Sequence, residues 1–571
     1  MSGSHRGGRP ISPWWADAVI YEVYIRSFAD SGTSGEHGVG DLRGVTSRIG
    51  HLADLGVDAL WVTPFYPSPG LDHGYDITDH CDVDPTHGDL ADFDAMVHAA
   101  HEHGLKVVVD IVPNHTSDQH PWFDAARTGH DPAARDRYIW RDPAPDGGPP
   151  NNWRSNFGGP AWTLDPDSGQ YWLHLYLPEQ PDLNWANPEV DIEFRRILDF
   201  WADRGVDGFR IDVAHSLLKH PGLPDNPALE PASNVLDLGR VASARELQRL
   251  YDVDQDEVLG IYRGWRTHLQ QRRDGPHLLL GETVVDDRDR VVRYVRDDDG
   301  LHAAMWFDVQ RQPFEAEALA HVLQAAEAAA PGRLSWFLSN HDRSRPTTRY
   351  GGGALGADRA LAVAAVVLAL PGPYLLYQGE ELGCADGSVA PEAAADPIAA
   401  RAGEHAVSRD RARTPMPWSA GPGGGFTRGT PWLPVSPRPP AGYAEEQYAD
   451  VTSHYQRWRA LLQANAAIRD RLPSSVTVDL PAAGLLRVHR GPLTALLNTG
   501  GDWMPLPMAG DRRGHPQRSA VRVWDSIGGA IADSTGGTDG TAGSASGSAG
   551  SMLAPSSASW WVEASHRREG L

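Results

Sequence analysis

Short runs of apolar residues alternate with amphipathic stretches along most of the chain. Eight of these runs are rich in β-branched and aromatic residues and are bounded by turn residues, which is typical of strands. They lie at residues 18–28, 58–66, 105–112, 206–213, 277–283, 303–309, 334–340 and 373–379. Between them, stretches such as 90–104 have apolar positions at helical spacing, and this one ends at Gly104, as helices commonly do. Strands that alternate with helices form a parallel sheet, and eight such units predict an α/β fold, a closed (β/α)8 TIM barrel.

Two segments depart from this alternation. Residues 115–185 are rich in proline and tryptophan and lack helical periodicity, which predicts a B subdomain inserted after the third strand. After about residue 480 the chain changes to short strand-like runs, which predict a C-terminal antiparallel β domain at 479–566. Within that domain, residues 528–551 are mostly Gly, Ser, Ala and Thr, a composition typical of a flexible segment. The catalytic barrel is therefore predicted to comprise residues 12–114 and 186–478.

The composition of the chain disfavours several classes of protein. The 571 residues have a formal net charge of -24 and no cluster of Lys and Arg, which argues against nucleic-acid binding. The longest apolar run, 360–377, is interrupted by Pro371 and Pro373, so it favours a buried helix and strand over a membrane span. Two cysteines are too few for a disulfide framework, and the first 15 residues lack the apolar centre of a secretory signal. A cytoplasmic location is the simpler prediction.

Charged and polar residues recur where the predicted strands end. These ends form the active-site face of (β/α) barrels. The residues are Asp110, Asn114 and His115 after the third strand, Arg210 and Asp212 in the fourth, Glu282 after the fifth, and Asn340, His341 and Asp342 after the seventh. Each alone has an ordinary alternative role, such as capping a helix or forming a turn. Their positions at matching strand ends favour one shared site.

Two carboxylates that flank one bond are the requirement for retaining glycoside hydrolysis. Arg210 precedes Asp212 by two residues and projects from the same face of the strand, so its charge is expected to keep Asp212 ionised as the nucleophile. Glu282 lies in the apolar stretch LLLGETVV with no adjacent cation, which predicts a raised pKa and a general-acid role. Asp342 could then stabilise an oxocarbenium-like transition state, and the two histidines could hydrogen-bond sugar hydroxyls.

Four motifs resemble the signature regions of the alpha-amylase family of glycoside hydrolases (family 13), in the same order and with similar spacing. They are DIVPNH (110–115), GFRIDVAH (208–215), GET (281–283) and FLSNHD (337–342). Four further stretches are similar to the alpha-glucosidase and oligo-1,6-glucosidase branch, and most of all to actinobacterial-type alpha-glucosidases. These are QPDLNW (180–185), GVDALWVTPFYPSP (56–69), HGYDITDH (73–80) and RDRARTPMPW (409–418). The resemblance covers roughly residues 12–475 and implies the barrel, the B subdomain and the C-terminal β domain, with Asp212 as nucleophile, Glu282 as acid/base and Asp342 as stabiliser.

The resemblance also implies a pocket that is closed behind the terminal glucose. In that branch the aspartate of GYD pairs with an arginine of the RTPMPW motif, which implies a pair between Asp76 and Arg413, with Arg409 as the alternative partner. A closed pocket accepts only a chain end, so exo-action on disaccharides and short oligosaccharides is expected. The aromatic residues expected to contact the sugar are Tyr75 and, as further wall candidates, Phe157 or Phe65.

The choice of bond and acceptor stays open at this point. By resemblance, Val213 accompanies tolerance of α-1,6 bonds, whereas the stretch around it favours α-1,4 bonds, and His215 is expected to line the acceptor side. The alternative activity is that of a glucosyltransferase or isomerase of the trehalose-synthase kind, which uses the same covalent intermediate. A non-catalytic scaffold is disfavoured because all three carboxylates are present. Loop 29–44, where relatives often bind a metal, keeps only two acidic ligands, so neither a metal nor another cofactor is predicted.

Overall fold

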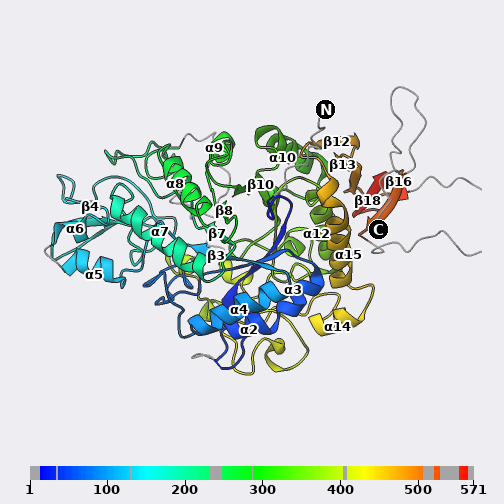
Figure 1. The fold of residues 1–571 in the computed structure, drawn as a ribbon, viewed down its shortest axis with the longest axis horizontal. Coiled ribbons are helices and arrows are strands. Elements are labelled where there is room, and N and C mark those ends of the chain that lie inside the picture. The colour runs from blue at the N-terminus through cyan, green and yellow to red at the C-terminus, as the bar shows by residue number, and fades with distance from the viewer. Residues whose placement is uncertain are drawn as a thin grey trace, which may run out of the picture.

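The computed structural model describes residues 13–33, 37–128, 131–229, 247–285, 287–402, 408–505, 520–526 and 552–563. Within them, eight parallel strands close into a barrel in the order β1-β11-β10-β9-β8-β7-β3-β2, at the centre of the molecule (Figure 1). The strands are β1 (Val19–Val23), β2 (Ala59–Val62), β3 (Lys106–Ile111), β7 (Gly208–Ile211), β8 (Leu278–Gly281), β9 (Ala303–Met305), β10 (Leu334–Phe337) and β11 (Tyr374–Tyr377). Each lies inside one of the eight apolar runs, so the predicted fold class is confirmed.

Helices surround the barrel, and several of them begin at a residue whose side chain accepts a hydrogen bond from the first turn. The predicted helix at 90–104 is α4, whose N-cap Asp89 accepts a hydrogen bond from the backbone N–H of Asp92, and it ends just before Gly104 at φ 77°. The helices outside the insertion are α1 (Ile25–Phe28), α2 (Leu42–Ser47), α3 (Ile49–Leu55), α4 (Leu90–Glu102), α7 (Pro188–Asp203), α8 (Val258–Gln270), α9 (Arg288–Arg293), α10 (Ala316–Ala329), α11 (Pro346–Arg349), α12 (Gly353–Val367), α13 (Pro397–Ala402), α14 (Ala444–Ala449) and α15 (His454–Ile468). Short 3-10 turns are η2 (Val309–Arg311), η3 (Pro391–Ala393), η5 (Arg409–Arg411), η6 (Pro422–Gly425) and η7 (Arg469–Arg471). In the described segments no helix is long and apolar enough to cross a bilayer.

Alternation along β7 places its side chains on two sides of the barrel wall. Phe209 and Ile211 are fully buried in the apolar layer between the barrel and its helices. Burying a side chain of this size contributes roughly 2–3 kcal/mol. Arg210 points the other way, into the barrel, and is equally buried. A charged side chain inside the barrel needs charged partners, and these form the site described below.

The chain between β3 and α7 forms the inserted subdomain at one end of the molecule (Figure 1). It consists of α5 (Pro121–Thr128), α6 (Pro132–Arg135) and a three-stranded sheet in the order β4-β6-β5, with β4 (Trp140–Arg141), β5 (Trp162–Leu164) and β6 (Tyr171–Leu173). The buried ammonium of Lys219 ties the end of this subdomain to the barrel. Its Nζ lies 2.6 Å from the Asp182 carboxylate and 2.9 Å from Asn114 Oδ1.

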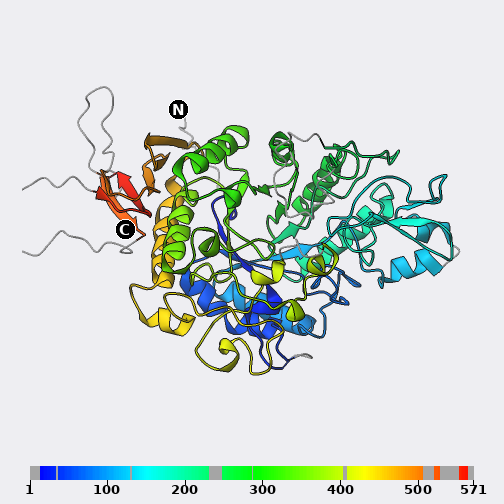
Figure 2. The ribbon, with the colours of Figure 1, turned by 180° about the vertical axis from the view of Figure 1, so that it is seen from behind.

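A five-stranded antiparallel sheet, in the order β12-β13-β14-β18-β16, lies at the opposite end of the molecule (Figures 1 and 2). Its strands are β12 (Thr477–Ala482), β13 (Leu485–Arg490), β14 (Leu493–Asn498), β16 (Ala520–Asp525) and β18 (Ser557–Glu563), with a separate pair β15 (Met504–Pro505) and β17 (Met552–Leu553). The indole N–H of Trp560 donates to the carbonyl of Ala365 and joins this sheet to α12. The Gly/Ser/Ala segment at 528–551 lies outside the described residues.

Candidate active site

One guanidinium holds three carboxylates together at the carboxyl ends of β3, β7 and β8. Arg210 Nη1 lies 2.9 Å from Asp110 Oδ1 and 2.7 Å from Asp212 Oδ1, and its Nη2 lies 2.7 Å from Glu282 Oε2. The parallel register explains the approach, since Arg210 stands beside Asp110 on β3 and beside Leu280, two residues before Glu282, on β8. Asp212 and Glu282 keep 10% and 9% of their side-chain surface exposed, so a substrate can reach both. The four residues, which the sequence placed at the ends of three strands, lie together in the structure.

The charges in this cluster differ from the sequence-based prediction in two respects. Glu282 does have an adjacent cation, because the partner comes from the neighbouring strand rather than from its own stretch of sequence. Arg210 is therefore shared and does not serve Asp212 alone. Burial raises the pKa of Asp212 well above its ordinary value, and Arg210 only partly opposes that shift. Burial likewise raises the pKa of Asp110 to about 6 against the opposing charge of Arg210.

The backbone turns sharply after the nucleophile candidate. Val213 has φ 36°, an unusual conformation for a β-branched residue that indicates a local constraint. The turn directs the Val213 N–H at Glu282 Oε2, 3.1 Å away, and the next N–H, of Ala214, donates to the carbonyl of Glu282 at 2.8 Å. Two consecutive backbone groups thus link the chain beside Asp212 to Glu282 and fix the position of one carboxyl relative to the other.

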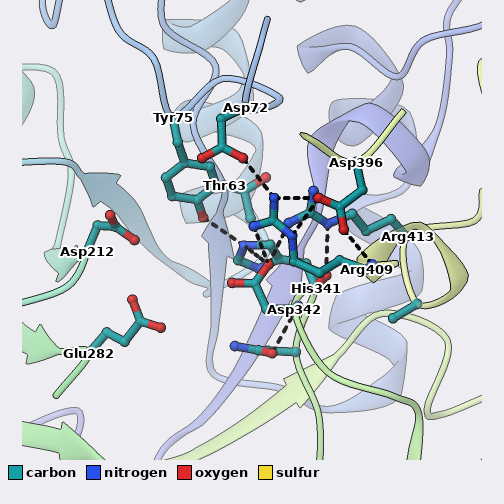
Figure 3. Close-up of polar contacts among 12 residues, drawn as sticks. Thr63, Asp72, Tyr75, Asp212, Glu282, His341, Asp342, Asp396, Arg409 and Arg413 are labelled. Atoms are coloured by element: carbon teal, nitrogen blue, oxygen red, sulfur yellow. Dashed lines mark hydrogen bonds and ion pairs between the residues drawn. The ribbon is translucent and has the colours of Figure 1, made fainter. Parts of the chain in front are cut away.

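A second cluster contains two arginines and three aspartates (Figure 3). Arg409 Nη2 lies 2.9 Å from Asp72 Oδ1 and 2.9 Å from Asp396 Oδ1, and its Nη1 lies 3.3 Å from Asp342 Oδ1. Arg413 contacts the same oxygen of Asp342 and also donates through Nε to the carbonyl of His341 at 2.9 Å. Figure 3 shows Asp212 and Glu282 on one side of the site and the two arginines on the other, with Tyr75, His341 and Asp342 between them.

This arrangement corrects the expected pair between Asp76 and Arg413. The pair across the site joins Asp72 to Arg409, the partner that the sequence placed second. The carboxylate of Asp76 is fully buried within its own loop, where it accepts hydrogen bonds from Ser68 Oγ at 2.8 Å and from the N–H groups of Leu71 and Asp72 at 2.9 and 3.1 Å. Asp76 therefore shapes the loop that presents Asp72.

The two arginines also determine the charges of the second cluster. Burial alone would raise the pKa of Asp342, but the neighbouring His341 ring and the guanidinium groups of Arg409 and Arg413 hold it well below its ordinary value. The same two cations lower the pKa of Asp396 against the effect of burial. For Asp72 burial outweighs Arg409, and the pKa rises to about 6. Asp342 is therefore firmly anionic, as a group that stabilises positive charge should be.

Tyr75 and the two histidines form the polar floor between the clusters. The ring of His341 is stacked between Tyr75 and Tyr24, at centroid distances of 5.6 and 5.5 Å. Burial lowers the pKa of His341 to about 3 and that of His115 to about 4, so both rings are neutral at neutral pH. His115 Nε2 lies 3.2 Å from the carbonyl of Tyr75. Neutral rings suit hydrogen bonding to hydroxyl groups, the role that the sequence leads us to expect for this pair.

The remaining predicted residues lie in different surroundings. The ring of Phe157 lies 5.0 Å from the guanidinium of Arg409, so it borders the second cluster. Phe65 does not line the site; it is fully buried in the main core against Phe93 and Trp201. His215 is buried beside the loop that follows Glu282, with its Nδ1 3.3 Å from the N–H of Val284.

Sequence reasoning missed three residues of the site. Asp72 stands three positions before Tyr75, in a loop with no periodicity to single it out. Asp396 lies in the alanine-rich loop after β11, whose unusual composition was the one available signal. Tyr176, from the inserted subdomain, is packed 5.2 Å from the ring of His115 and 5.4 Å from that of Phe157, and the nearby charges of Asp212 and Glu282 add to burial in raising its pKa.

The acidic residues of loop 29–44 hydrogen-bond to protein groups. Asp30 accepts from the N–H groups of Gly32 and Gly38 at 2.7 and 2.9 Å. Asp41 is the N-cap of α2 and accepts from the N–H of Gly44 at 2.6 Å. Over the described ranges of the chain, no three His, Cys, Asp or Glu side chains are grouped so as to hold a metal ion.

Comparisons with known proteins agree with this geometry. Residues 22–471 match the family model described as the catalytic domain of alpha amylase. A probable alpha-glucosidase from Rhizobium meliloti is 39% identical over 84% of this chain and 88% of its own length. An oligo-1,6-glucosidase from Heyndrickxia coagulans is 35% identical over 75% of this chain and 80% of its own length. The crystal structure of the alpha-glucosyl transfer enzyme XgtA superposes with a TM-score of 0.86 at 34% identity, over 97% of this chain and all of that one.

Proposed function

Since the chain belongs to the alpha-amylase family of glycoside hydrolases, we propose that it is a retaining, exo-acting alpha-glucosidase. Its substrates are disaccharides and short oligosaccharides with a terminal α-linked glucose. The observation that supports this most strongly is the bridge made by Arg409, which joins Asp342 to Asp72 on the side of the site away from Asp212 and Glu282. A bridge there limits the space beyond the terminal sugar and favours a chain end over an internal bond.

In the first step the carboxylate of Asp212 attacks the anomeric carbon while Glu282 protonates the leaving oxygen. The C–O bond to the leaving group breaks, and a covalent glucosyl-Asp212 ester forms. Glu282 Oε2 accepts from Arg210 and from the Val213 N–H, which leaves Oε1 to hold the proton. The anionic Asp342 stabilises the positive charge that develops on the sugar.

In the second step Glu282, now a carboxylate, takes a proton from water as the water attacks the anomeric carbon. The ester bond to Asp212 breaks and glucose leaves with its original α configuration. Arg210 contacts both carboxyl groups, so it holds them in register through the exchange of charge between the two steps. Among linkages, α-1,4 bonds are favoured by the stretch around Val213, and α-1,6 bonds are the second candidate, since an oligo-1,6-glucosidase matches over most of the chain.

Incubation with maltose, isomaltose and sucrose, followed by product analysis, tests the proposal. Glucose as the sole product from maltose supports hydrolysis, and the ratio of rates on maltose and isomaltose gives the linkage preference. The anomer released first is followed by NMR: α-glucose supports double displacement, whereas β-glucose at early times contradicts it.

Transfer of glucose to an acceptor sugar is the second candidate activity. It is favoured by the likeness to an alpha-glucosyl transfer enzyme over nearly the whole chain. Both activities use the same glucosyl-Asp212 ester and differ in whether water or a sugar hydroxyl attacks it. A new disaccharide formed from maltose, increasing with acceptor concentration, would assign transfer rather than hydrolysis as the main activity.

A further inference from the structure

A buried glutamate on β1, Glu22, contacts the site through His341. Glu22 is fully buried and accepts a hydrogen bond from the backbone N–H of His341 at 3.2 Å. The same oxygen, Oε1, lies 2.6 Å from Nδ1 of the His341 ring. The other oxygen, Oε2, has no hydrogen-bond partner within the described residues. The polar contacts of the Glu22 carboxyl are thus made with a single residue of the site.

Glu22 begins a chain of short contacts that ends at the nucleophile. His341 Nε2 lies 3.0 Å from Tyr75 Oη, and Tyr75 Oη lies 3.0 Å from Asp110 Oδ2. Asp110 is held by Arg210, which also contacts Asp212. Figure 3 shows the middle of this chain, where the Tyr75 hydroxyl points at the His341 ring.

The hydrogen-bonded contacts from Glu22 to Asp110 need more protons than these residues carry in their usual ionisation states. Three contacts, from Glu22 to His341, from His341 to Tyr75 and from Tyr75 to Asp110, each need one proton between two heavy atoms. An ionised Glu22, a neutral imidazole, a phenol and an ionised Asp110 provide only two. One further proton must therefore reside on Glu22, on the imidazole or on Asp110, or else two lone pairs face each other at 3.0 Å or less.

The surroundings favour Glu22 as the holder of the third proton. The imidazole of His341 is a poor holder, because burial, assisted by three arginines, lowers its pKa to about 3 against the opposing charge of Asp342. Asp110 is a weaker holder than Glu22, because Arg210 donates directly to both of its oxygens.

Burial and the charges around Glu22 determine whether its carboxyl is protonated. Burial raises its pKa well above the ordinary value, and the charges of Asp342 and Asp110 raise it further. Arg210 and the His341 N–H oppose this, and the hydroxyl of Tyr377 on β11 also faces it. Burial is the largest of these effects, so the neutral form of Glu22 is favoured.

We propose that Glu22 is a positioning residue for His341 and acts as a neutral carboxylic acid that donates its proton to Nδ1. The donation fixes the Nε2–H tautomer of the ring, so Nε2–H donates to Tyr75 and the Tyr75 hydroxyl donates to Asp110. If Glu22 ionises, Nδ1 takes the ring proton, Tyr75 turns to Nε2, and the contact between Tyr75 and Asp110 loses its proton. The inference rests on the proposed function, since it makes the ionisation of Glu22 a source of the alkaline limb of that activity, beside the deprotonation of the general acid Glu282.

The tautomer is tested directly by NMR on protein labelled with ¹⁵N-histidine, with His341→Gln used to assign the signals. The expected result at neutral pH is a bare Nδ1 and a protonated Nε2 for His341, which reverses when the pH is raised. A protonated Nδ1 at neutral pH would overturn the proposal. This measurement needs no substrate, so it distinguishes failure of the inference from failure of the proposed activity.

The pH profile of kcat/KM on an aryl α-glucoside is compared for the wild type, Glu22→Gln and Glu22→Leu. The amide of Glu22→Gln supplies an N–H to Nδ1 but has no proton to lose, so the alkaline limb is expected to move up to the pH that deprotonation of Glu282 sets. Because the amide nitrogen no longer accepts from the His341 N–H, a small loss of the optimum rate is expected. Glu22→Leu removes the donor altogether and should lower kcat/KM by about 10- to 100-fold, the usual cost of losing a partner that orients a histidine. An unchanged alkaline limb in Glu22→Gln, or equal losses in both variants, would show a merely structural role.

Discussion

The two clusters of the site use the same residue types in different proportions. In the first, one guanidinium, that of Arg210, is shared by three carboxylates, whereas in the second two guanidiniums, those of Arg409 and Arg413, are shared by three. Most of these groups are buried, and Asp342 is the most exposed of them, with 27% of its side-chain surface accessible. Burial therefore acts on both clusters, and they differ most in the ratio of cations to anions.

The ratio determines which cluster can exchange protons. Where one cation serves three carboxylates, burial outweighs it, and the pKa values of Asp110 and Asp212 are raised. Where two cations serve three, the pKa values of Asp342 and Asp396 are lowered and their charges are fixed, and only that of Asp72 is raised, to about 6. The first cluster contains the groups proposed to gain and lose protons and bonds, and the second contains the group proposed to remain an anion throughout. The two ratios match those two tasks.

Removing the nucleophile should have the largest effect on the first cluster. Asp212→Asn keeps an oxygen for the contact with Arg210 but cannot form the glucosyl ester, so kcat is expected to fall at least about 10⁴-fold. The steady-state rate on an aryl α-glucoside measures the loss, and circular dichroism checks that the fold is intact. Glu282→Gln should be similarly impaired on substrates with poor leaving groups. Near-normal turnover in either folded variant would remove that residue from its proposed role.

Replacing the single guanidinium tests the ratio itself. A lysine at position 210 keeps the charge but cannot donate to three carboxylates at once, so kcat is expected to fall by about 10²- to 10³-fold. Arg210 lowers the pKa values of Asp110 and Asp212, so weakening it should raise them. The ionised form then appears only at higher pH, and the acid limb of kcat/KM should move to higher pH. Arg204→Lys, in the exposed ion pair with Asp94, is the matched control and should change neither quantity. An acid limb that stays in place in Arg210→Lys would contradict the assignment.

The second cluster can be opened by removing one anion from it. Asp72→Asn leaves Arg409 without one of its three carboxylates and should reduce kcat/KM by about 10- to 100-fold, because the position of the terminal sugar loosens. Asp76→Asn is the matched control in the same loop. Because Asp76 accepts two backbone N–H groups there, Asp76→Asn should lower Tm more than Asp72→Asn does, and it should reduce kcat/KM less. The reverse pattern would restore the pair first expected between Asp76 and Arg413.

These variants also mark where sequence reasoning succeeded and failed. The strands were predictable because each is a short apolar run between turn residues, and the carboxylates followed because barrel chemistry lies at strand ends. The contact between Arg210 and Glu282 was not predictable, since it depends on the register of β7 against β8. A side chain that follows the next strand of the barrel has no signature in the local stretch around Arg210.

The loops were harder to predict than the strands for a related reason. Asp72 and Asp76 differ in direction because the loop between them passes through positive φ at His73 (55°) and Gly74 (107°). Neither residue type forces such a turn, and for His73 the tertiary structure imposes it. Asp396 was missed because the loop after β11 has no periodicity and approaches the site only through Arg409.

Glu380 is a buried carboxyl that forms no ion pair among the described residues, so it extends the comparison of the two clusters. Its substitution is expected to have the smallest effect. Glu380 lies after β11 and accepts a hydrogen bond from Ser339 Oγ. Burial raises its pKa to about 8 against the opposing charges of Arg349 and Arg345. Because the folded state then binds the proton more tightly than the unfolded state, the stability from this group is complete below about pH 4.5 and is lost as the pH rises towards 8.

Glu380→Gln mimics the protonated form and should remove this dependence. Between pH 5 and pH 8 the wild type is expected to lose up to about 1.4 kcal/mol of unfolding free energy per pH unit relative to the variant. Measuring Tm for both across this interval tests it, with the exposed Glu102→Gln on α4 as a control that should follow the wild type. Parallel curves for wild type and Glu380→Gln would mean that Glu380 is ionised despite burial. Burial would then not be enough to keep a carboxyl protonated in this fold. The raised pKa values of Asp110 and Asp212 would need a cause other than burial beside a single cation.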